Sequence, residues 1–419
     1  MRVLIRNATI VSPSHPQEPT DILIENGIII KISKGSNTSA DKIIEIKNLH
    51  LSAGWMDCFA NFCDPGNEQK ETLETGSAAA AAGGFTDVML IPNTMPVVHN
   101  KSQIEYIVQK SKNLSVTIHP IGAITKNTDG TELSEMYDMS HSGSIAFSDG
   151  IRSLQSSGIM LKALEYIKAI NGTIIQLPDD KKIAGHGQVN EGLVSVRLGL
   201  AGKPDIAEEL MIARDIELLK YTDSKIHFTG ISTKRSLSLI TNAKKDGLKV
   251  SCSVAPYHLF FCDEDLGNYD TDLKVNPPLR RREDMIALRE AVKNNEIDFI
   301  ASHHMPQHWD DKTCEFEYAE YGITGLESVF GVLGTCGIPF LDFVKMQTEN
   351  IRGIFNLPVN EIKEGAKASL TLFDPGMEYV FAEGDIYSKS RNCPYIGKKL
   401  KGKSFGIING DRLFLNELN

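Results

Sequence analysis

Several features that would place a protein in a special class are missing from this sequence of 419 residues. No apolar run reaches the roughly 18 to 20 residues that a membrane helix needs. The first apolar run, at residues 3–5, is broken by Arg6 too early for a signal peptide. Blocks of like charge are short, and a net charge of -10 argues against a nucleic-acid or membrane-surface partner.

Cysteine is sparse and dispersed. Seven cysteines, an odd number in a long chain, suit a reducing compartment better than a disulfide framework, so we expect a cytoplasmic protein. Cys58 and Cys63 form a conceivable zinc pair, but they lie five residues apart and would face opposite sides of a strand. The cysteines therefore predict neither disulfide bonds nor a thiolate metal site.

The middle of the chain alternates between strand-like and helix-like patterns. This alternation is typical of βαβ units and a parallel sheet, and the number of strand-like segments is that of a (β/α)8 TIM-type barrel. The segments are the one near Asp57 and residues 86–91, 115–118, 144–147, 173–175, 225–228, 249–254 and 298–301. A helix is predicted from Glu71 to Ala82, ended by Gly83 and Gly84.

Short strands with turn residues between them occupy both ends of the chain. We therefore predict two domains, a small β-sandwich formed by residues 1–52 plus 366–419 and a barrel of residues 53–365. Residues 305–321 lack periodicity and follow the last barrel strand. They are a candidate lid, and a plain surface loop is the alternative.

The segment Asp57–Gly66, DCFANFCDPG, carries the most information. With the preceding LSAGWM it resembles the first barrel strand of dihydroorotases, where the pattern D-x-H-x-H-F-R-[DE]-P-G follows a P-G pair. Seven further runs resemble the same family in family order: IPNTMP (91–96), HPIGAIT (119–125), AFSDG (146–150), ISTK (231–234), VNPPLR (275–280), GITGLE (322–327) and SKSRNCPYIG (388–397).

This resemblance covers nearly the whole chain and implies the amidohydrolase-superfamily barrel of dihydroorotases from multifunctional or aspartate-carbamoyltransferase-associated complexes. Active relatives interconvert dihydroorotate and N-carbamoyl-L-aspartate with a zinc-bound hydroxide, and an aspartate after the eighth strand moves the proton. Zinc matters there because it lowers the pKa of bound water from about 15.7 to about 7. Membership implies the fold and does not by itself imply the activity.

The first-strand positions depart from the family pattern. Residues i and i+2 of a strand point the same way, so the family's H-x-H delivers two imidazoles to one metal centre. Phe59 and Asn61 stand at those two positions, and Cys63 stands where the family has a substrate-binding arginine. Phenylalanine cannot ligate a metal, and a neutral amide is poorly suited to zinc. Phe59 is interpreted as a core aromatic residue.

Later positions depart in the same way. Leu177 and Gly230 replace the fifth-strand and sixth-strand histidines, and Gln307 replaces a substrate-contacting histidine. His303 replaces the proton-moving aspartate, and Asp149 is the one metal carboxylate that remains. The resemblance therefore predicts a degenerate zinc site, and we expect no bound metal or other cofactor.

Some family positions persist. Asn93 and Asn276 match substrate-contacting asparagines, yet each also stands in a proline-containing turn where asparagine is favoured for backbone reasons. His258 has a family counterpart and is interpreted as a structural histidine.

A relocated metal site is an alternative that the sequence leaves open. Its candidate ligands are His119, Asp149, His303, His304 and His308. Adjacent His303 and His304 would point opposite ways on a strand, so one of them at most would face the barrel.

Three hypotheses about function follow. The chain is a catalytically silent homologue with a structural or regulatory role, with aspartate carbamoyltransferase as the candidate partner. Alternatively, it is a metal-free hydrolase of a small cyclic amide that uses His303 as a general base, or it retains dihydroorotase activity. Family analogy also suggests a homodimer.

Overall fold

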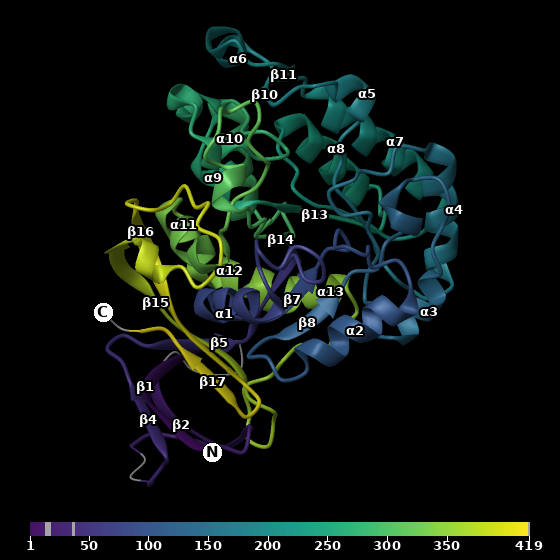
Figure 1. The fold of residues 1–419 in the computed structure, drawn as a ribbon. Helices are drawn as coiled ribbons and strands as arrows, with labels where there is room; N and C mark the ends of the chain where they lie inside the picture. Colours follow the sequence, from purple (N-terminus) through teal and green to yellow (C-terminus); the bar gives the residue numbers. More distant parts are fainter. Residues whose placement is uncertain (13–17, 36–37, 418–419) are drawn as a thin grey trace.

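The computed structural model describes residues 1–12, 18–35 and 38–417. Figure 1 shows strands from both ends of the chain lying together beside a larger body in which helices surround short strands. This is the predicted combination of a (β/α)8 barrel and a β-sandwich domain. The exact division at residues 1–52 plus 366–419 stays a prediction.

The two ends of the chain join in one eight-stranded sheet, with strand order β17-β16-β15-β5-β1-β2-β3 and β4 paired with β1. Its strands are β1 (Arg2–Val11), β2 (Pro19–Glu25), β3 (Ile28–Ser33), β4 (Lys42–Glu45), β5 (His50–Ala53), β15 (Ser369–Val380), β16 (Lys399–Asn409) and β17 (Arg412–Leu415). Antiparallel pairing of Leu51 in β5 with Leu372 in β15 connects the two ends. Alternating residues such as Ile22 and Ile24 bury their side chains in a hydrophobic core that belongs to this sheet.

The barrel strands are parallel and form two groups, β6-β7-β8 and β9-β12-β13-β14. They are β6 (Trp55–Ala60), β7 (Phe85–Leu90), β8 (Thr117–Pro120), β9 (Ile174–Gln176), β12 (Ile226–Phe228), β13 (Val250–Val254) and β14 (Phe299–Ile300). Between the groups, Phe147 alone bridges Gly122 on one side and Ile174 on the other. The prediction of a full strand at residues 144–147 was therefore wrong. The Gly122 amide donates both to the Ser144 hydroxyl at 2.9 Å and to the Ala146 carbonyl at 3.1 Å, so Ser144 itself contributes a side chain and not its backbone to this contact.

The helices follow the strands around the barrel. They are α1 (Leu73–Gly83), α2 (Lys101–Ser111), α3 (Met136–His141), α4 (Ser157–Lys168), α5 (Lys181–Ala184), α6 (Leu193–Leu198), α7 (Ile206–Thr222), α8 (Lys234–Lys245), α9 (Pro256–Phe260), α10 (Arg282–Lys293), α11 (Val329–Thr335), α12 (Phe340–Lys345) and α13 (Ile351–Ile354). A short excursion between α5 and α7 carries α6 and the paired strands β10 (Val189–Asn190) and β11 (Gly202–Lys203). Within the described ranges, none of these helices combines the length and apolar character needed to cross a membrane.

Helix α1 shows how local sequence sets an element's limits. Thr72 and Thr75 form a reciprocal capping box at the first turn. Gly84 ends the helix with a left-handed backbone at φ 94°, where an added Cβ would also lie 2.8 Å from Thr371. The predicted glycine stop is confirmed.

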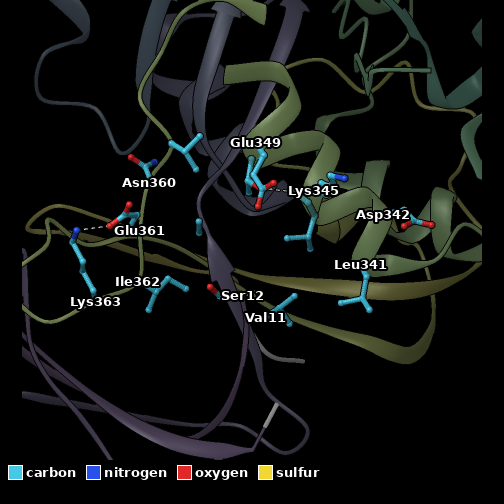
Figure 2. A pocket seen from close by; sticks show the side chains of 14 residues that line it. Val11, Ser12, Leu341, Asp342, Lys345, Glu349, Asn360, Glu361, Ile362 and Lys363 are labelled. Atoms are coloured by element: carbon cyan, nitrogen blue, oxygen red, sulfur yellow. Dashed lines mark hydrogen bonds and ion pairs between the residues drawn. The ribbon is translucent and has the colours of Figure 1, made fainter. Parts of the chain in front are cut away.

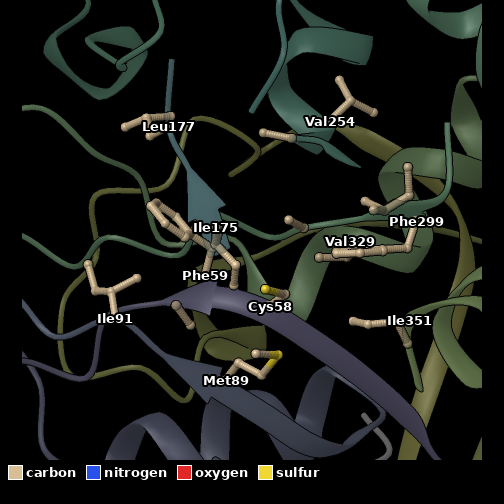
Figure 3. Close-up of a cluster of buried hydrophobic side chains, with 14 of the residues drawn as sticks. Cys58, Phe59, Met89, Ile91, Ile175, Leu177, Val254, Phe299, Val329 and Ile351 are labelled. Atoms are coloured by element: carbon tan, nitrogen blue, oxygen red, sulfur yellow. The ribbon is translucent and has the colours of Figure 1, made fainter. Parts of the chain in front are cut away.

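Apolar side chains fill the barrel interior. Figure 3 shows Phe59 and Leu177 among buried residues contributed by several barrel strands and the helices that follow them. The carboxyl ends of the strands, where barrel enzymes place their sites, are therefore lined by packed hydrocarbon as well as by polar groups.

Candidate functional site at the barrel mouth

Four of the family zinc-site positions come together at the mouth of the barrel. The rings of Phe59 and His303 lie 4.7 Å apart between centroids, at an interplanar angle of 32°. A Cβ added to Gly230 would lie 2.5 Å from Cε1 of His303 and 3.3 Å from Cδ1 of Leu177. Phe59, Leu177 and His303 are each at most 2% exposed. The His303 ring therefore occupies the space into which a side chain at position 230 would project.

His303 is a buried, neutral histidine. Its Nε2 lies 2.8 Å from the hydroxyl of Thr229. Burial, and secondarily the neighbouring His258, lower the pKa of His303 to about 3. At neutral pH the ring therefore carries one proton and no charge. Its predicted role as a general base stays a prediction.

Asp149, the surviving family carboxylate, is held by Thr125. Its Oδ1 accepts from the Thr125 amide at 2.9 Å, and its Oδ2 accepts from the Thr125 hydroxyl at 2.6 Å. Burial raises the pKa of Asp149 to about 6. Both oxygens are therefore occupied by hydrogen-bond donors.

Asn93 is tied to the same turn. Its Nδ2 donates to the Asp149 carbonyl at 3.1 Å, and its Oδ1 accepts from the Ile151 amide at 2.9 Å. The turn has Gly150 at φ 63°, where an added Cβ would collide with Oδ1 of Asn93. These contacts give Asn93 a structural role, and its predicted contact with substrate remains a prediction.

The residues that follow β6 use their polar groups within the protein. Oδ1 of Asn61 accepts from the Cys63 amide at 2.8 Å. Cys63 is 3% exposed, and burial raises the pKa of its thiol to about 12. It is a neutral group at the position of the family's arginine. Consequently Asn61 lacks the imidazole, and Cys63 lacks the positive charge, of the family residue that each replaces.

His304 points away from His303. Its Nδ1 accepts from the Gly325 amide at 3.2 Å, and its Nε2 lies 3.4 Å from Oε2 of the buried Glu71. The two adjacent histidines thus belong to different environments, His303 beside Phe59 and His304 beside Glu71.

Asn276 lies in a small charged cluster at the rim. Oδ1 of Asn276 accepts from Nζ of Lys203 at 2.7 Å, and Nδ2 donates to Asp179 at 3.4 Å. Lys203 and Asp179 also form an ion pair at 2.9 Å, and Lys203 is 7% exposed. The amide groups of Asn276 are therefore used within the protein.

Residues 305–321, the candidate lid, are fixed to the barrel by hydrogen bonds. Gln307 accepts from Nζ of Lys70 at 2.6 Å and donates to the Tyr321 carbonyl at 2.7 Å. Nζ of the buried Lys274 donates to the carbonyls of residues 316 and 317 at 2.7 and 2.9 Å. The segment is therefore held by a buried cation and by the loop that follows β6, and its role as a lid stays a prediction.

The donor set at the mouth does not fit zinc. Among the residues that the structure describes, no three histidine, cysteine, aspartate or glutamate side chains gather in a group able to hold a metal ion. His119 lies 2.9 Å from Asp87, and His308 lies 3.2 Å from Asp310, so each pairs with a carboxylate of its own. Zinc needs several imidazole, thiolate or carboxylate ligands converging on one point.

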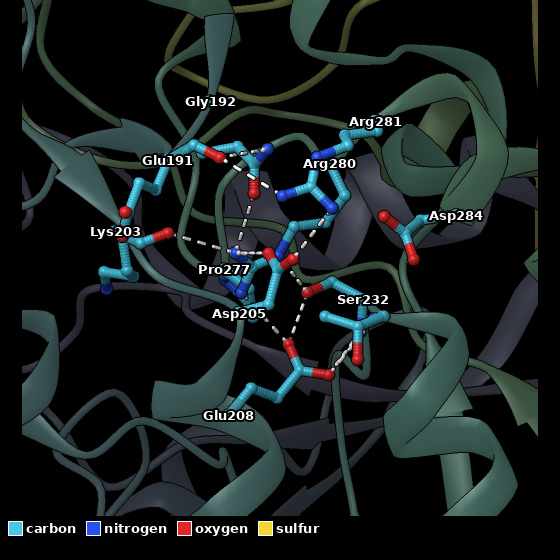
Figure 4. A network of polar contacts seen from close by, with 12 residues as sticks. Glu191, Gly192, Lys203, Asp205, Glu208, Ser232, Pro277, Arg280, Arg281 and Asp284 are labelled. Carbon is cyan, nitrogen blue, oxygen red and sulfur yellow. Dashed lines mark hydrogen bonds and ion pairs between the residues drawn. The ribbon is translucent and has the colours of Figure 1, made fainter.

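A buried arginine network supports the rim, and sequence reasoning missed it (Figure 4). Arg280 is 3% exposed; its guanidinium donates to Ser232 at 2.8 Å and to Asp205 at 2.9 Å, and lies 3.4 Å from Glu208. The arginine also reaches Asn190 at 3.0 Å. It therefore connects the excursion that carries β10 to helix α7 and to the loop after β12. Only the tertiary fold reveals these pairings.

A cavity of about 820 Å³ lies elsewhere, where the terminal sheet meets the barrel (Figure 2). Val11, Leu341 and Ile362 contribute apolar lining, with Lys345 and Lys363 among its charged residues. None of the mouth residues lines it.

Comparison with known proteins settles the family. A family model described as "Dihydro-orotase-like" matches residues 50–236. A protein named dihydroorotase from Geobacter metallireducens is 39% identical over 98% of this chain and 99% of its own length. Another from Pelotomaculum thermopropionicum is 37% identical over 100% and 99%. The chain belongs to the dihydroorotase family.

Solved structures bear on the fold of this dihydroorotase-family chain. An L-hydantoinase (dihydropyrimidinase) from Arthrobacter aurescens superposes with a TM-score of 0.85 at 20% identity, over 100% of this chain and 96% of that one. A D-hydantoinase (dihydropyrimidinase) from Thermus sp. gives 0.84 at 18% identity, over 99% and 95%. These likenesses confirm the predicted fold class and, at such low identity, carry no argument about activity.

Proposed function

We propose that this chain is a dihydroorotase-family protein that does not carry out the family's zinc-dependent reaction and that acts as a structural or regulatory subunit. One observation carries the proposal: the His303 ring lies over Gly230 and against Phe59, in the space that ligands and metal would share. A zinc-activated hydroxide requires ligands and an open coordination position. Packed rings provide neither.

The remaining carboxylate supports the same proposal. Asp149 accepts one hydrogen bond from Thr125 on each of its oxygens, so a metal would have to share an oxygen with one of these donors. The family's anion-binding position is also changed, because the neutral Cys63 cannot form the bidentate contact that arginine makes with a carboxylate. Both metal activation and substrate capture would therefore be weakened.

The proposed partner is aspartate carbamoyltransferase, because the sequence motifs resemble dihydroorotases that associate with that enzyme. We further propose a cytoplasmic homodimer. Size-exclusion chromatography with light scattering, on the chain alone and mixed with the carbamoyltransferase of the same organism, tests both assemblies. A dimer and a co-eluting complex at micromolar concentration are expected. Separate elution of the two proteins would contradict the partnership.

A turnover assay tests the absence of catalysis. Dihydroorotate, N-carbamoyl-L-aspartate, a hydantoin and a dihydropyrimidine would each be incubated with the full chain, with and without added zinc. No turnover is expected. Zinc-dependent turnover would contradict the proposal, and zinc-independent turnover lost in His303→Ala would instead favour a metal-free hydrolase.

A further inference from the structure

A line of hydrogen-bonded side chains runs through the interior of the barrel and ends at His303. His227 lies between two serine hydroxyls, with Nδ1 2.8 Å from Ser251 and Nε2 3.0 Å from Ser253. Ser253 donates to Thr229 at 3.0 Å, and Thr229 lies 2.8 Å from Nε2 of His303. All five side chains are at most 8% exposed, so water does not compete for their hydrogen bonds.

The protons on this line have a definite order. A hydroxyl group has one proton to donate. Because Ser253 gives its proton to Thr229, its contact with His227 is one in which Nε2–H of the imidazole donates. The other nitrogen of His227, Nδ1, then accepts from the Ser251 hydroxyl.

The proton order extends to the far end of the line, at His303. The Thr229 oxygen accepts from Ser253, and Nε2 of His303 lies 2.8 Å from the same hydroxyl, so we assign the Thr229 proton to Nε2. His303 is neutral, so its single proton resides on Nδ1. Every donor between His227 and His303 thus points toward the mouth. His227 is also neutral, because burial lowers its pKa, and its ring stacks on Phe299 at 4.6 Å.

We infer that Ser251, His227, Ser253 and Thr229 form a positioning relay that fixes His303 as the Nδ1–H tautomer and holds its ring over Gly230. The lone pair of Nε2 is engaged by Thr229, and Nδ1 carries the proton. The ring therefore has no nitrogen lone pair free to act as a base toward a ligand.

The relay also defines the chemistry of contacts at the mouth. Any group that reaches Nδ1 of His303 must accept a hydrogen bond, so a carbonyl or carboxylate oxygen fits and an N–H or ammonium group does not. This inference deepens the proposed function and rests on it in one respect, that the mouth is not a zinc centre. The mouth then presents one neutral donor, Nδ1–H of His303, in place of a metal ion acting as a Lewis acid.

Nitrogen NMR on the full chain labelled with 15N-histidine tests the relay, with His303 assigned by comparison with His303→Gln. The wild-type spectrum should show Nδ1 protonated and Nε2 unprotonated at His303. Thr229→Val removes the hydroxyl at nearly constant shape and should shift both ring nitrogens toward a mixture of tautomers. Thr229→Ser restores the hydroxyl and should return the wild-type pattern.

Thr348→Val is the matched control, because Thr348 is also buried and its hydroxyl donates to the Val344 carbonyl at 2.6 Å, outside the relay. It should leave the His303 resonances unchanged. A wild-type proton on Nε2, or unchanged His303 shifts in Thr229→Val, would overturn the relay. If Thr229→Val does not fold, the position of the His303 proton in the wild-type spectrum is enough to accept or reject the relay. The zinc content of the same samples tests the proposed function separately, because bound zinc would contradict that proposal whatever the NMR spectra show about the relay.

Discussion

Replacing Gly230 by alanine tests directly whether His303 fills the mouth. Gly230 has φ +65°, and an added Cβ would lie 2.5 Å from Cε1 of His303. Two costs therefore add. A left-handed backbone costs an L-residue about 1–2 kcal/mol, and overpacking a close-packed core costs about 1–3 kcal/mol. Gly230→Ala should lower the free energy of unfolding by about 2–5 kcal/mol.

Gly247→Ala separates the two costs. Gly247 has a similar left-handed backbone, φ +81°, and nothing lies within 4 Å of an added Cβ. It should lose only the backbone part, about 1–2 kcal/mol. Urea titrations followed by circular dichroism and tryptophan fluorescence would measure the differences, provided both probes give one transition.

A double variant identifies the colliding group. In Gly230→Ala/His303→Ala the ring is gone, so the steric part of the cost should be recovered as a coupling of about 1–3 kcal/mol. If Gly230→Ala costs no more than Gly247→Ala, or if the two substitutions are additive, the His303 ring does not lie over Gly230 and the reasoning fails.

Two further predictions concern buried charges. Asp57 accepts two hydrogen bonds from Ser302, and burial raises its pKa to about 7 from 3.8, so the folded state keeps this proton to higher pH than the unfolded state. The stability that this group contributes therefore falls as pH rises from about 4 to about 7. Over that window, the free energy of unfolding of Asp57→Asn should increase by about 2–4 kcal/mol relative to that of the wild type, as measured by urea titration. A difference that does not change with pH would contradict this. Lys274→Met removes two hydrogen bonds to loop carbonyls, so hydrogen exchange in residues 305–321 should accelerate by about tenfold or more, whereas the exposed Lys182→Met should change nothing there. Unchanged exchange in Lys274→Met would show that the loop is held by other contacts.

Sequence patterns predicted the strands and helices whose limits depend on residues close together in the chain. The terminal strands are short apolar runs, such as residues 22–24, with turn residues between them, and the first helix has capping residues at its start and glycine at its end, so both were readable from sequence. Residues 144–147 look like a strand by the same criterion. Phe147 forms the two bridges, the Ala146 carbonyl accepts from Gly122, and Ser144 contacts the same Gly122 amide through its side chain, an interaction that apolar periodicity does not reveal.

The candidate site was predictable by residue type but not by arrangement. Phenylalanine and leucine at positions 59 and 177 exclude metal ligation whatever the fold. The sequence gives no sign that His303 would fill the space above Gly230, since the two are far apart along the chain and meet only when the barrel closes. The pairing of Arg280 with Glu208 depends in the same way on contacts across the fold.

Zinc content tests the central claim most directly. The full chain would be produced in zinc-supplemented medium, dialysed against metal-free buffer and measured by elemental analysis alongside its protein concentration. A mouth filled by Phe59, Leu177 and His303 predicts less than about 0.1 zinc per chain. A stoichiometry of about one or two zinc ions per chain, with matching anomalous scattering peaks at the barrel mouth, would contradict the account.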